Sequence, residues 1–275
     1  MKKDPPPSGG LLHNELFAEM GLGPQWRLRT TAAMTERRED ARDTPAGAVS
    51  RPDQPAEPVQ PQPGERREQR IARMDWAALA QETADCQACG LCRQRQQAVL
   101  GVGDTAADWL FIGEGPGAEE DARGEPFVGQ AGKLLDAMLR AIGLRRGDDV
   151  YIANAVKCRP PNNRTPEVDE IAACKPYLLR QIELLQPRLI VLLGRVAVQA
   201  LLGESGTLAA LRGQTFSHRT ARGEIPMLVS YHPAYLLRNL PDKAKAWQDL
   251  CRARQLMRQA KSAAADGPIA AADTA

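Results

Sequence analysis

The sequence predicts an α/β fold in which a parallel β-sheet carries helices on both faces. Short apolar runs, each followed by glycine or polar residues, are typical of strands buried on both faces of a sheet. Stretches with apolar residues at helical spacing separate these runs, and strands that alternate with helices form parallel sheets. The four runs occupy residues 109–112, 150–153, 189–193 and 227–230.

Helices are expected before, between and after these strands. The first, over residues 75–85, leads into a group of cysteines. Ligands bind at the carboxyl ends of the strands in such a sheet, so the polar segments that follow the four runs are the candidate functional segments. The remaining helices are expected at 131–142, 166–185, 196–202 and 243–259.

The two ends of the chain differ from its middle in composition. Residues 1–73 are charged, aperiodic and rich in proline, so they bury too little apolar surface to offset their ordering entropy, and we expect most of them to be disordered. Residues 11–20 are the exception: they form either a short helix that docks on a partner or on the domain, or a marginal isolated helix. Residues 260–275 are expected to be a disordered, alanine-rich tail, which leaves 74–259 as the folded domain.

Charge and hydropathy narrow the class of protein only a little. Lys and Arg number 36 against 34 Asp and Glu, so any basic surface for nucleic acid must be local. No apolar run approaches the length of a membrane span. No signal-peptide pattern precedes the domain, and the expected location is the cytoplasm.

Four cysteines in two separated pairs are the most informative chemical feature. Cys86 and Cys89 form a C-x2-C, and Cys158 is followed by Cys174 one helix-length downstream. Thiolates at such spacings can meet at one metal centre. Disulfides fit less well, because cysteines in a cytosolic chain are more often metal-binding or catalytic. An iron–sulfur or zinc site with four cysteine ligands is therefore predicted.

A glycine-rich segment, Gly-Glu-Gly-Pro-Gly at 113–117, follows the first strand. Its glycines let the backbone approach a ligand closely, and free N–H groups can hold an anion or a carbonyl oxygen. The chain has no Walker loop, because Gly132-Lys133 is followed by Leu134 rather than by Ser or Thr. It does not match the dinucleotide-binding fingerprint either. Phe127 lies nearby between glycines, where it either packs into its own domain or stacks on a nucleobase.

Polar residues also follow the second and fourth strands. Asn154 offers a donor and an acceptor, which suits the edge of a pyrimidine, although an amide at a strand end can also bond local backbone. His232 begins a predicted loop at the same edge of the sheet. The two leucines of this loop are either core anchors or a wedge for an opened base step. The loop continues as Tyr235, Leu236, Leu237 and Arg238.

Together these motifs resemble the iron–sulfur-containing, family 4 uracil-DNA glycosylases. The resemblance covers roughly residues 85–250 and rests on Gly-Glu-Gly-Pro-Gly, Pro-Phe-Val-Gly-x-Ala-Gly, Lys-Cys-Arg-Pro-Pro and His-Pro-Ala-Tyr-Leu-Leu-Arg. It implies a three-layer α/β/α sandwich around a central four-stranded parallel sheet. It also implies a 4Fe–4S cluster, with Cys92 and Cys251 outside the ligand set. The implied ligands are Cys86, Cys89, Cys158 and Cys174.

The resemblance implies a DNA repair enzyme that flips uracil out of DNA and hydrolyses its N-glycosidic bond, leaving an abasic site. Asn154 would separate uracil from cytosine, and His232 would stabilise the charge that grows on uracil O2. Glu120 is the predicted water-activating residue, with Glu114 and Asp121 as competitors. The implied uracil-binding residues are Glu114, Gly115, Gly117, Phe127, Asn154 and His232. The implied DNA-intercalating residues are Tyr235, Leu236, Leu237 and Arg238.

The expected partner is uracil-containing DNA, double- or single-stranded, bound by a monomer, and the N-terminal extension is a candidate site for a partner protein. Arg159 directly follows Cys158, without the basic insertion by which a related branch cross-links to its product, so a hydrolase without lyase activity is predicted. Two alternatives stay open. One is a non-catalytic, zinc-stabilised nucleic-acid-binding module, and the other is a small-molecule enzyme that holds a nucleotide phosphate at the glycine-rich loop.

Overall fold

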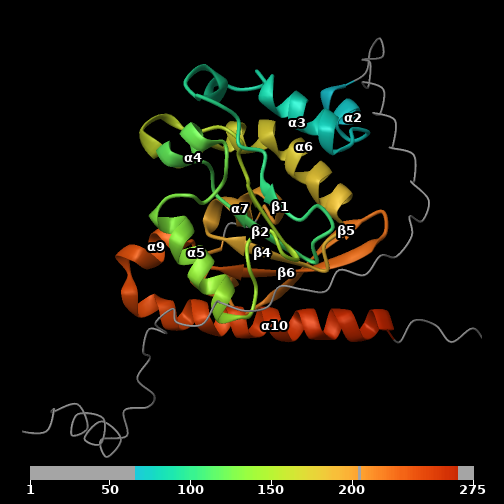
Figure 1. Ribbon diagram of the computed structural model, residues 1–275, viewed down its shortest axis with the longest axis vertical. Helices are drawn as coiled ribbons and strands as arrows, with labels where there is room; N and C mark the ends of the chain where they lie inside the picture. The colour runs from blue at the N-terminus through green and yellow to red at the C-terminus, as the bar shows by residue number, and fades with distance from the viewer. Residues whose placement is uncertain (1–65, 204–205, 266–275) are drawn as a thin grey trace, which may run out of the picture. The chain divides into compact units, whose positions relative to one another are not determined.

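A computed structural model describes residues 66–203 and 206–265, which all lie in one compact unit. Six strands form a single sheet in the order β1-β3-β2-β4-β6-β5, drawn at the centre of Figure 1. Their bounds are β1 Val102–Gly103, β2 Trp109–Gly113, β3 Val150–Asn154, β4 Leu189–Leu193, β5 Thr215–Thr220 and β6 Gly223–Ser230.

The sheet is mixed rather than purely parallel. Strands β3, β2, β4 and β6 pair in parallel, as expected for the four apolar runs, while β1 and β5 add antiparallel edges. The prediction of a four-stranded sheet is therefore corrected to six strands. Strand β1 has only two residues, and β5 alternates exposed residues with more buried ones, of which Phe216 alone is apolar, so neither edge contains an apolar run.

Register places the ends of the parallel strands level with one another. Gly113 pairs with Asn154, and Leu193 pairs with Ser230. The segments that follow these four positions therefore leave the sheet at one edge. Strands β3 and β4 lie on opposite sides of β2, so the order in which the chain adds strands to the sheet reverses at β2. A crevice forms at the strand ends beside such a reversal.

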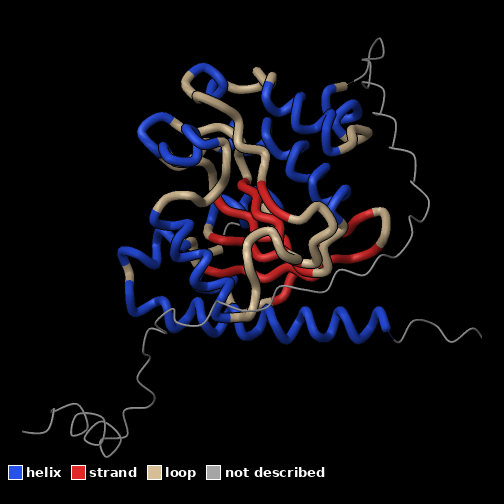
Figure 2. The backbone as a smooth tube through the Cα atoms, in the orientation of Figure 1, coloured by secondary structure: helices blue, strands red, loops and turns tan. Residues whose placement is uncertain are grey.

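Helices cover both faces of the sheet, as the alternating pattern predicts (Figures 1 and 2). Helices α3, α6 and α7 pack against one face, and α5, α9 and α10 pack against the other. The helices of the described region are α2 Arg67–Ile71, α3 Trp76–Ala84, α4 Ala118–Arg123, α5 Gln130–Ala141, α6 Val168–Leu185, α7 Arg195–Leu201, α8 Leu208–Leu211, α9 Pro233–Arg238 and α10 Lys243–Ala265. Short 3-10 turns lie at η1 Gly90–Arg93, η2 Pro161–Asn163 and η3 Leu240–Asp242.

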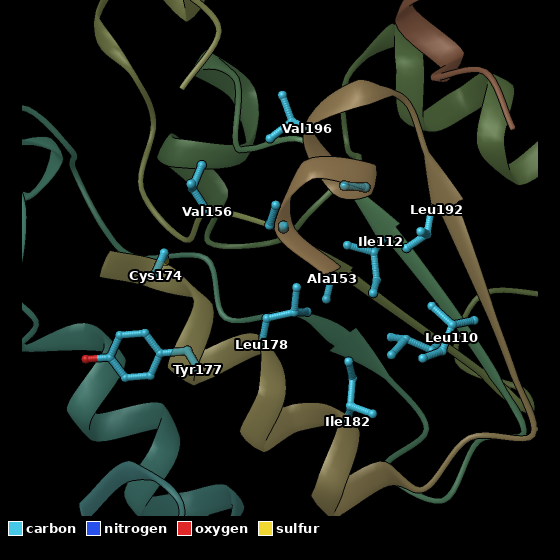
Figure 3. Packing of buried hydrophobic residues seen from close by; sticks show 14 of the residues in the cluster. Leu110, Ile112, Ala153, Val156, Cys174, Tyr177, Leu178, Ile182, Leu192 and Val196 are labelled. Carbon is cyan, nitrogen blue, oxygen red and sulfur yellow. The ribbon is translucent and has the colours of Figure 1, made fainter. Parts of the chain in front are cut away.

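Alternate residues of each central strand face opposite helical layers. In β2, Leu110 and Ile112 face the α6 layer and share one buried cluster with Leu178 (Figure 3), while Phe111 faces α5 and α10. All five β2 residues are buried, because both faces of the sheet are covered. This burial explains why the strands appear in the sequence as continuous apolar runs rather than as alternating ones.

Two predicted boundaries at the ends of the domain need correction. Helix α2 lies inside the stretch 1–73, for which the composition predicts disorder, and its Ile71 is fully buried against the α3–α6 layer. Helix α10 continues to Ala265, into the predicted tail at 260–275. The short helix expected at 11–20 lies outside the described residues. Among the helices that the structure describes, none is both long and apolar enough to cross a membrane.

The burial of Ile71 predicts that α2 belongs to the folded domain. Replacing Ile71 with Ala should lower the free energy of unfolding by about 2–4 kcal/mol, because it removes buried methyl groups and leaves a cavity. Denaturant titration of the full chain measures this loss. Glu68→Ala, an exposed position on the same helix, is the matched control and should change stability by less than about 0.5 kcal/mol. Equal, small effects of both changes would place α2 outside the cooperative fold.

Candidate active site and cysteine cluster

A cavity of about 760 Å³ opens at the carboxyl edge of the parallel strands. Each central strand contributes the residues that directly follow it or end it: residues 114–117 after β2, Asn154 at the end of β3, Gly194 after β4, and Tyr231 with His232 after β6. The cavity thus brings together the following predicted site residues: Glu114, Gly115, Gly117, Glu120, Phe127, Asn154, His232, Tyr235 and Arg238.

Gly113 leaves room for two of these side chains, Phe127 and Asn154, to pack against the end of β2. A Cβ at Gly113 would lie 2.4 Å from Phe127 Cζ and 2.5 Å from Asn154 Oδ1, closer than side-chain atoms can approach. Only glycine at the end of β2 therefore lets the aromatic ring and the amide both pack over the strand. The ring of Phe127 is 6% exposed and its backbone φ is 57°, an unusual value for a residue with a side chain.

Asn154 places a buried oxygen without a hydrogen-bond partner in the cavity. It is 2% exposed, and its Oδ1 is the one buried side-chain N or O atom of the described residues that has no hydrogen-bond partner. Leaving such a group unpaired costs about 1–3 kcal/mol. Its main-chain carbonyl accepts a hydrogen bond from Lys157 Nζ at 2.8 Å, which fixes the strand end that holds the amide. A ligand that donates a hydrogen bond would satisfy this oxygen.

His232 is the N-cap of α9 and faces Phe127. Its Nδ1 accepts a hydrogen bond from the Ala234 N–H at 3.1 Å, so in the neutral ring the proton lies on Nε2. The imidazole stacks on the Phe127 ring with a centroid separation of 5.3 Å. Burial and the charge of Arg238 lower the pKa of His232 from 6.5 to about 4, although Glu120 acts in the opposite direction. The side chain is therefore a neutral hydrogen-bond donor at pH 7.

Glu120 ties two loops of the cavity together. One carboxylate oxygen accepts from the Gly117 N–H at 3.1 Å, so the Glu120 side chain reaches back to the N-cap of α4. The other accepts from the N–H groups of Val128 and Gly129, both at 2.9 Å. Three backbone donors hold this carboxylate in place. Helix α4 begins at Ala118, directly after the glycine-rich segment 113–117.

The two competing carboxylates differ in their surroundings. Asp121 is 1% exposed and accepts from the Gln96 N–H at 2.9 Å, so it anchors the loop before β1. Glu114 lines the cavity, and its carboxylate accepts no hydrogen bond from the described part of the chain. Burial raises the pKa of Glu114, and the nearby charge of Arg238 partly opposes this shift.

The predicted intercalating loop is a helix, and its side chains divide between core and solvent. Pro233 is the first residue of α9, a position that proline favours. Leu236 is 1% exposed and packs with α5 and α10, so its assignment to DNA intercalation is corrected: it is a core residue. Leu237 is 42% exposed. Tyr235 donates from its hydroxyl to Asp242 at 2.6 Å, and Arg238 is exposed at the rim of the cavity.

The four predicted ligand cysteines line one small cavity between α3, η1 and α6. None of the six cysteines forms a disulfide. Cys174 is buried, which raises the pKa of its thiol to about 12, and burial also raises the pKa values of Cys89 and Cys158. Among the described residues, however, no three His, Cys, Asp or Glu side chains are grouped so that they could hold a metal ion. The predicted cluster is therefore not confirmed.

Hydrogen-bond donors point at three of these sulfurs. Arg95 Nη1 lies 2.9 Å from Cys158 Sγ, and the Lys157 N–H lies 3.2 Å from Cys174 Sγ. The Ala88 N–H donates to Cys86 Sγ at 3.5 Å. N–H groups directed at sulfur stabilise negative charge on a thiolate, and they commonly surround iron–sulfur clusters. The surroundings of these three sulfurs thus suit negatively charged thiolates.

Comparisons with known proteins agree with this geometry. The family model of the uracil DNA glycosylase superfamily matches residues 100–251. A type-4 uracil-DNA glycosylase of Pyrobaculum aerophilum is 42% identical over 64% of this chain and 92% of its own length. Type-4 enzymes of Archaeoglobus fulgidus and Thermotoga maritima are 44% and 41% identical, over 58% and 66% of this chain and 81% and 94% of their own lengths.

The chain belongs to the uracil DNA glycosylase superfamily. The predicted resemblance to family 4 and the α/β fold of the superfamily are confirmed. A type-5 enzyme of Thermus thermophilus is also similar, at 36% identity over 49% of this chain and 68% of its own length.

The sequence alone does not reveal several residues of this glycosylase pocket. Arg164 and Thr165 line the cavity from the segment before α6, and Tyr231 lines it from the segment before α9. Arg146 lies outside the cavity but donates to two carbonyls of the Phe127 loop. Arginines are frequent in the chain, and no sequence pattern distinguishes the few that lie at or near the pocket.

The lowered pKa of His232 predicts how stability depends on pH. Between pH 6.5 and about 4 the unfolded chain binds a proton at this residue and the folded chain does not, so the stabilisation is complete above pH 6.5 and is lost as the pH falls through this window. Between pH 7 and pH 5, wild type should lose on the order of 1–2 kcal/mol more than His232→Gln. Denaturant unfolding at the two pH values measures this difference, and identical pH dependence of the two proteins would refute the burial of a neutral imidazole.

Proposed function

We propose that this chain removes uracil from DNA by hydrolysing its N-glycosidic bond, leaving an abasic site for base excision repair. The observation that carries the proposal is the buried, unpartnered Oδ1 of Asn154 inside the cavity. The names of the relatives, type-4 uracil-DNA glycosylases, support the same reaction. A base reaches such a cavity only when it is rotated out of the helical stack.

The pocket residues fit the edge and the face of uracil. Asn154 Oδ1 can accept from uracil N3–H, while its amide nitrogen donates to uracil O4. Cytosine presents an acceptor at N3 and a donor at its amino group, so both contacts would oppose it. The Phe127 ring, held over Gly113, provides an aromatic face on which the flipped pyrimidine can stack.

His232 is placed to stabilise the leaving group. As the bond between C1′ and N1 breaks, its electron pair moves onto uracil and spreads to O2. The Nε2–H of neutral His232 can donate to that oxygen because Nδ1 is occupied by the Ala234 N–H. A neutral donor in a dry site stabilises the developing anion without transferring its proton beforehand, and loss of such a donor typically reduces a rate by roughly 10²–10³.

A water molecule completes the reaction by adding hydroxide to C1′ of the oxocarbenium-like sugar, with its proton passing to a base. The sequence predicts Glu120 for this role, but three backbone N–H groups occupy its carboxylate. We therefore assign the positioning of Gly117 and of the Phe127 loop to Glu120. Glu114 lines the cavity, its carboxylate accepts no hydrogen bond from residues 66–203 or 206–265, and it is the better candidate for orienting the water.

DNA is the proposed partner, bound by a single copy of the chain. Leu237 and Arg238 lie on the exposed side of α9 beside the cavity mouth, where an apolar side chain can fill the space of the flipped base. Leu236 takes no part because it is buried. Arg238 also lies near Glu114 and could contact a phosphate next to the flipped nucleotide.

We further propose that Cys86, Cys89, Cys158 and Cys174 hold a 4Fe–4S cluster. The shared cavity and the N–H groups directed at the sulfurs support this proposal. When bound, the cluster would cross-link the segment before β1 to α6 and to the segment between β3 and α6, and it would supply structure rather than a reacting atom.

The base-reading role of Asn154 predicts the outcome of a direct test. A uracil-containing oligonucleotide incubated with the full chain should yield abasic sites, which alkali then cleaves. Asn154→Asp should lower the single-turnover excision rate by roughly 100-fold, because a carboxylate replaces the donor to O4 and repels that oxygen. The ratio of uracil to cytosine excision should fall with it, since a carboxylate can accept from the cytosine amino group.

Asn162→Asp is the matched control. It makes the same chemical change at an exposed residue of η2 that does not line the cavity, and it should leave the excision rate within about twofold. Wild-type rates in Asn154→Asp would remove this residue from base recognition. Absence of any uracil excision by the wild-type chain would overturn the proposed function itself.

The cluster proposal predicts a structural defect when one ligand is lost. Cys158→Ser should give protein with little iron or acid-labile sulfide and a lower melting temperature, because two segments lose their cross-link. Cys251→Ser changes an exposed cysteine of α10 and should keep the metal content and the activity of wild type. A soluble Cys158→Ser protein without iron, yet with wild-type melting temperature and excision rate, would show that the cysteines have no such role.

A further inference from the structure

Phe127 adopts a backbone conformation that its surroundings must enforce. Its φ of 57° lies in the left-handed region, which costs a residue with a side chain roughly 1–2 kcal/mol. The ring is nevertheless buried, beside Asn154 and His232. Such conformations persist only where neighbouring groups fix them.

Arg146 fixes the carbonyl side of this loop. It lies between α5 and β3, outside the cavity, and its Nη1 donates to the Pro126 carbonyl at 2.8 Å. Its Nη2 donates to the Phe127 carbonyl at 2.7 Å. The guanidinium is itself held by Asp136 Oδ1 on α5, which accepts from Nε at 3.1 Å and from Nη2 at 3.0 Å.

Helix α5 closes the space behind the same carbonyl. A Cβ at Gly132 would lie 1.7 Å from the Phe127 oxygen, so the absence of a side chain there lets the loop lie directly on the helix. The Phe127 carbonyl is therefore confined between the α5 backbone and the Arg146 guanidinium. On the other side of the ring, the N–H groups of Val128 and Gly129 donate to Glu120.

The loop is thus held by two charged groups of opposite sign. Arg146 donates to the two carbonyls at 126–127, and Glu120 accepts from the two N–H groups at 128–129. Only a planar guanidinium can satisfy two carbonyls and one carboxylate from a single side chain in this geometry. Lysine, with one nitrogen, can reach some of these acceptors but not all of them in the same arrangement.

We propose that Arg146 is a positioning residue for base recognition, which sets the orientation of the Phe127 ring against the flipped uracil. The inference rests on the proposed function and adds to it a residue that does not touch the substrate. Arg146 acts through the backbone of Phe127. A displacement of about 1 Å at a reacting base can reduce a rate by about 10²-fold, so loss of this hold should appear in excision rather than in binding of undamaged DNA.

The test is a double-substitution cycle between Arg146→Gln and Phe127→Leu, read as single-turnover excision of uracil from duplex DNA. Arg146→Gln should lower the rate roughly 10–100-fold in the wild-type background, but less than about threefold in the Phe127→Leu background, because the ring it orients is already gone. Arg145→Gln, at the neighbouring exposed arginine, should leave the rate within about twofold. Equal losses in both backgrounds would overturn the proposal.

A second measurement separates this inference from the proposed function. Binding to a duplex that contains 2′-fluoro-2′-deoxyuridine, relative to undamaged duplex, reports recognition of the base without cleavage. Arg146→Gln should reduce that preference several-fold and leave affinity for undamaged duplex unchanged. An unchanged preference would overturn the positioning role, whereas failure of the wild-type chain to excise uracil would overturn only the function.

Arg146→Lys covers the case in which Arg146→Gln does not fold. It keeps the positive charge and the ion pair with Asp136 but loses part of the hold on the two carbonyls. It should recover wild-type melting temperature and a rate between those of wild type and Arg146→Gln. An excision rate of the Arg146→Lys protein equal to that of wild type would contradict the need for a guanidinium fork.

Discussion

The pocket depends on the close approach of two side chains, those of Phe127 and Asn154, to the backbone at the end of β2. Because Gly113 has no side chain, the Phe127 ring and the Asn154 amide can occupy the same few ångströms above the strand. Gly132 does the same for the Phe127 carbonyl against α5. A larger residue at Gly113 or Gly132 would move the Phe127 ring away from the Asn154 amide. Sheet register then completes the site, because it places Asn154 level with Gly113.

Several pocket residues also cap helices or connect loops. The hydrogen bonds that they make in doing so determine which of their atoms remain available to a ligand. His232 caps α9 through Nδ1, which leaves the proton on Nε2, the atom that the proposed reaction uses. Glu120 caps α4 and holds the Phe127 loop, which makes it an anchor rather than a free base. Because Glu120 is held by backbone N–H groups at the start of α4 and in the Phe127 loop, we propose Glu114 rather than Glu120 as the carboxylate that orients water.

The sequence is sufficient for elements whose signal is local. The four buried strands and the long helices follow from continuous apolar runs and helical spacing, and the motif residues after the strands meet at one edge because parallel strands end together. Strand β5 is not predictable, since an edge strand with alternating polar residues resembles a loop. The burial of Leu236 beside the exposed Leu237 depends on how α9 rotates against α5, which no local pattern records. Arg146 is similarly invisible, because the two carbonyls that it binds lie about 20 residues away.

A single residue, Lys157, joins the cysteine region to Asn154. Lys157 is fully buried: its Nζ donates to the Asn154 carbonyl and to Gln181, while its backbone N–H donates to Cys174 Sγ. Burial lowers the pKa of Lys157 to about 8, opposed by the charges of Cys174 and Cys158. The hydrogen bonds of Lys157 thus connect Cys174 to the end of β3. Whatever holds the thiols in place therefore also holds the end of β3, and disorder at the cysteines would reach the pocket through one residue.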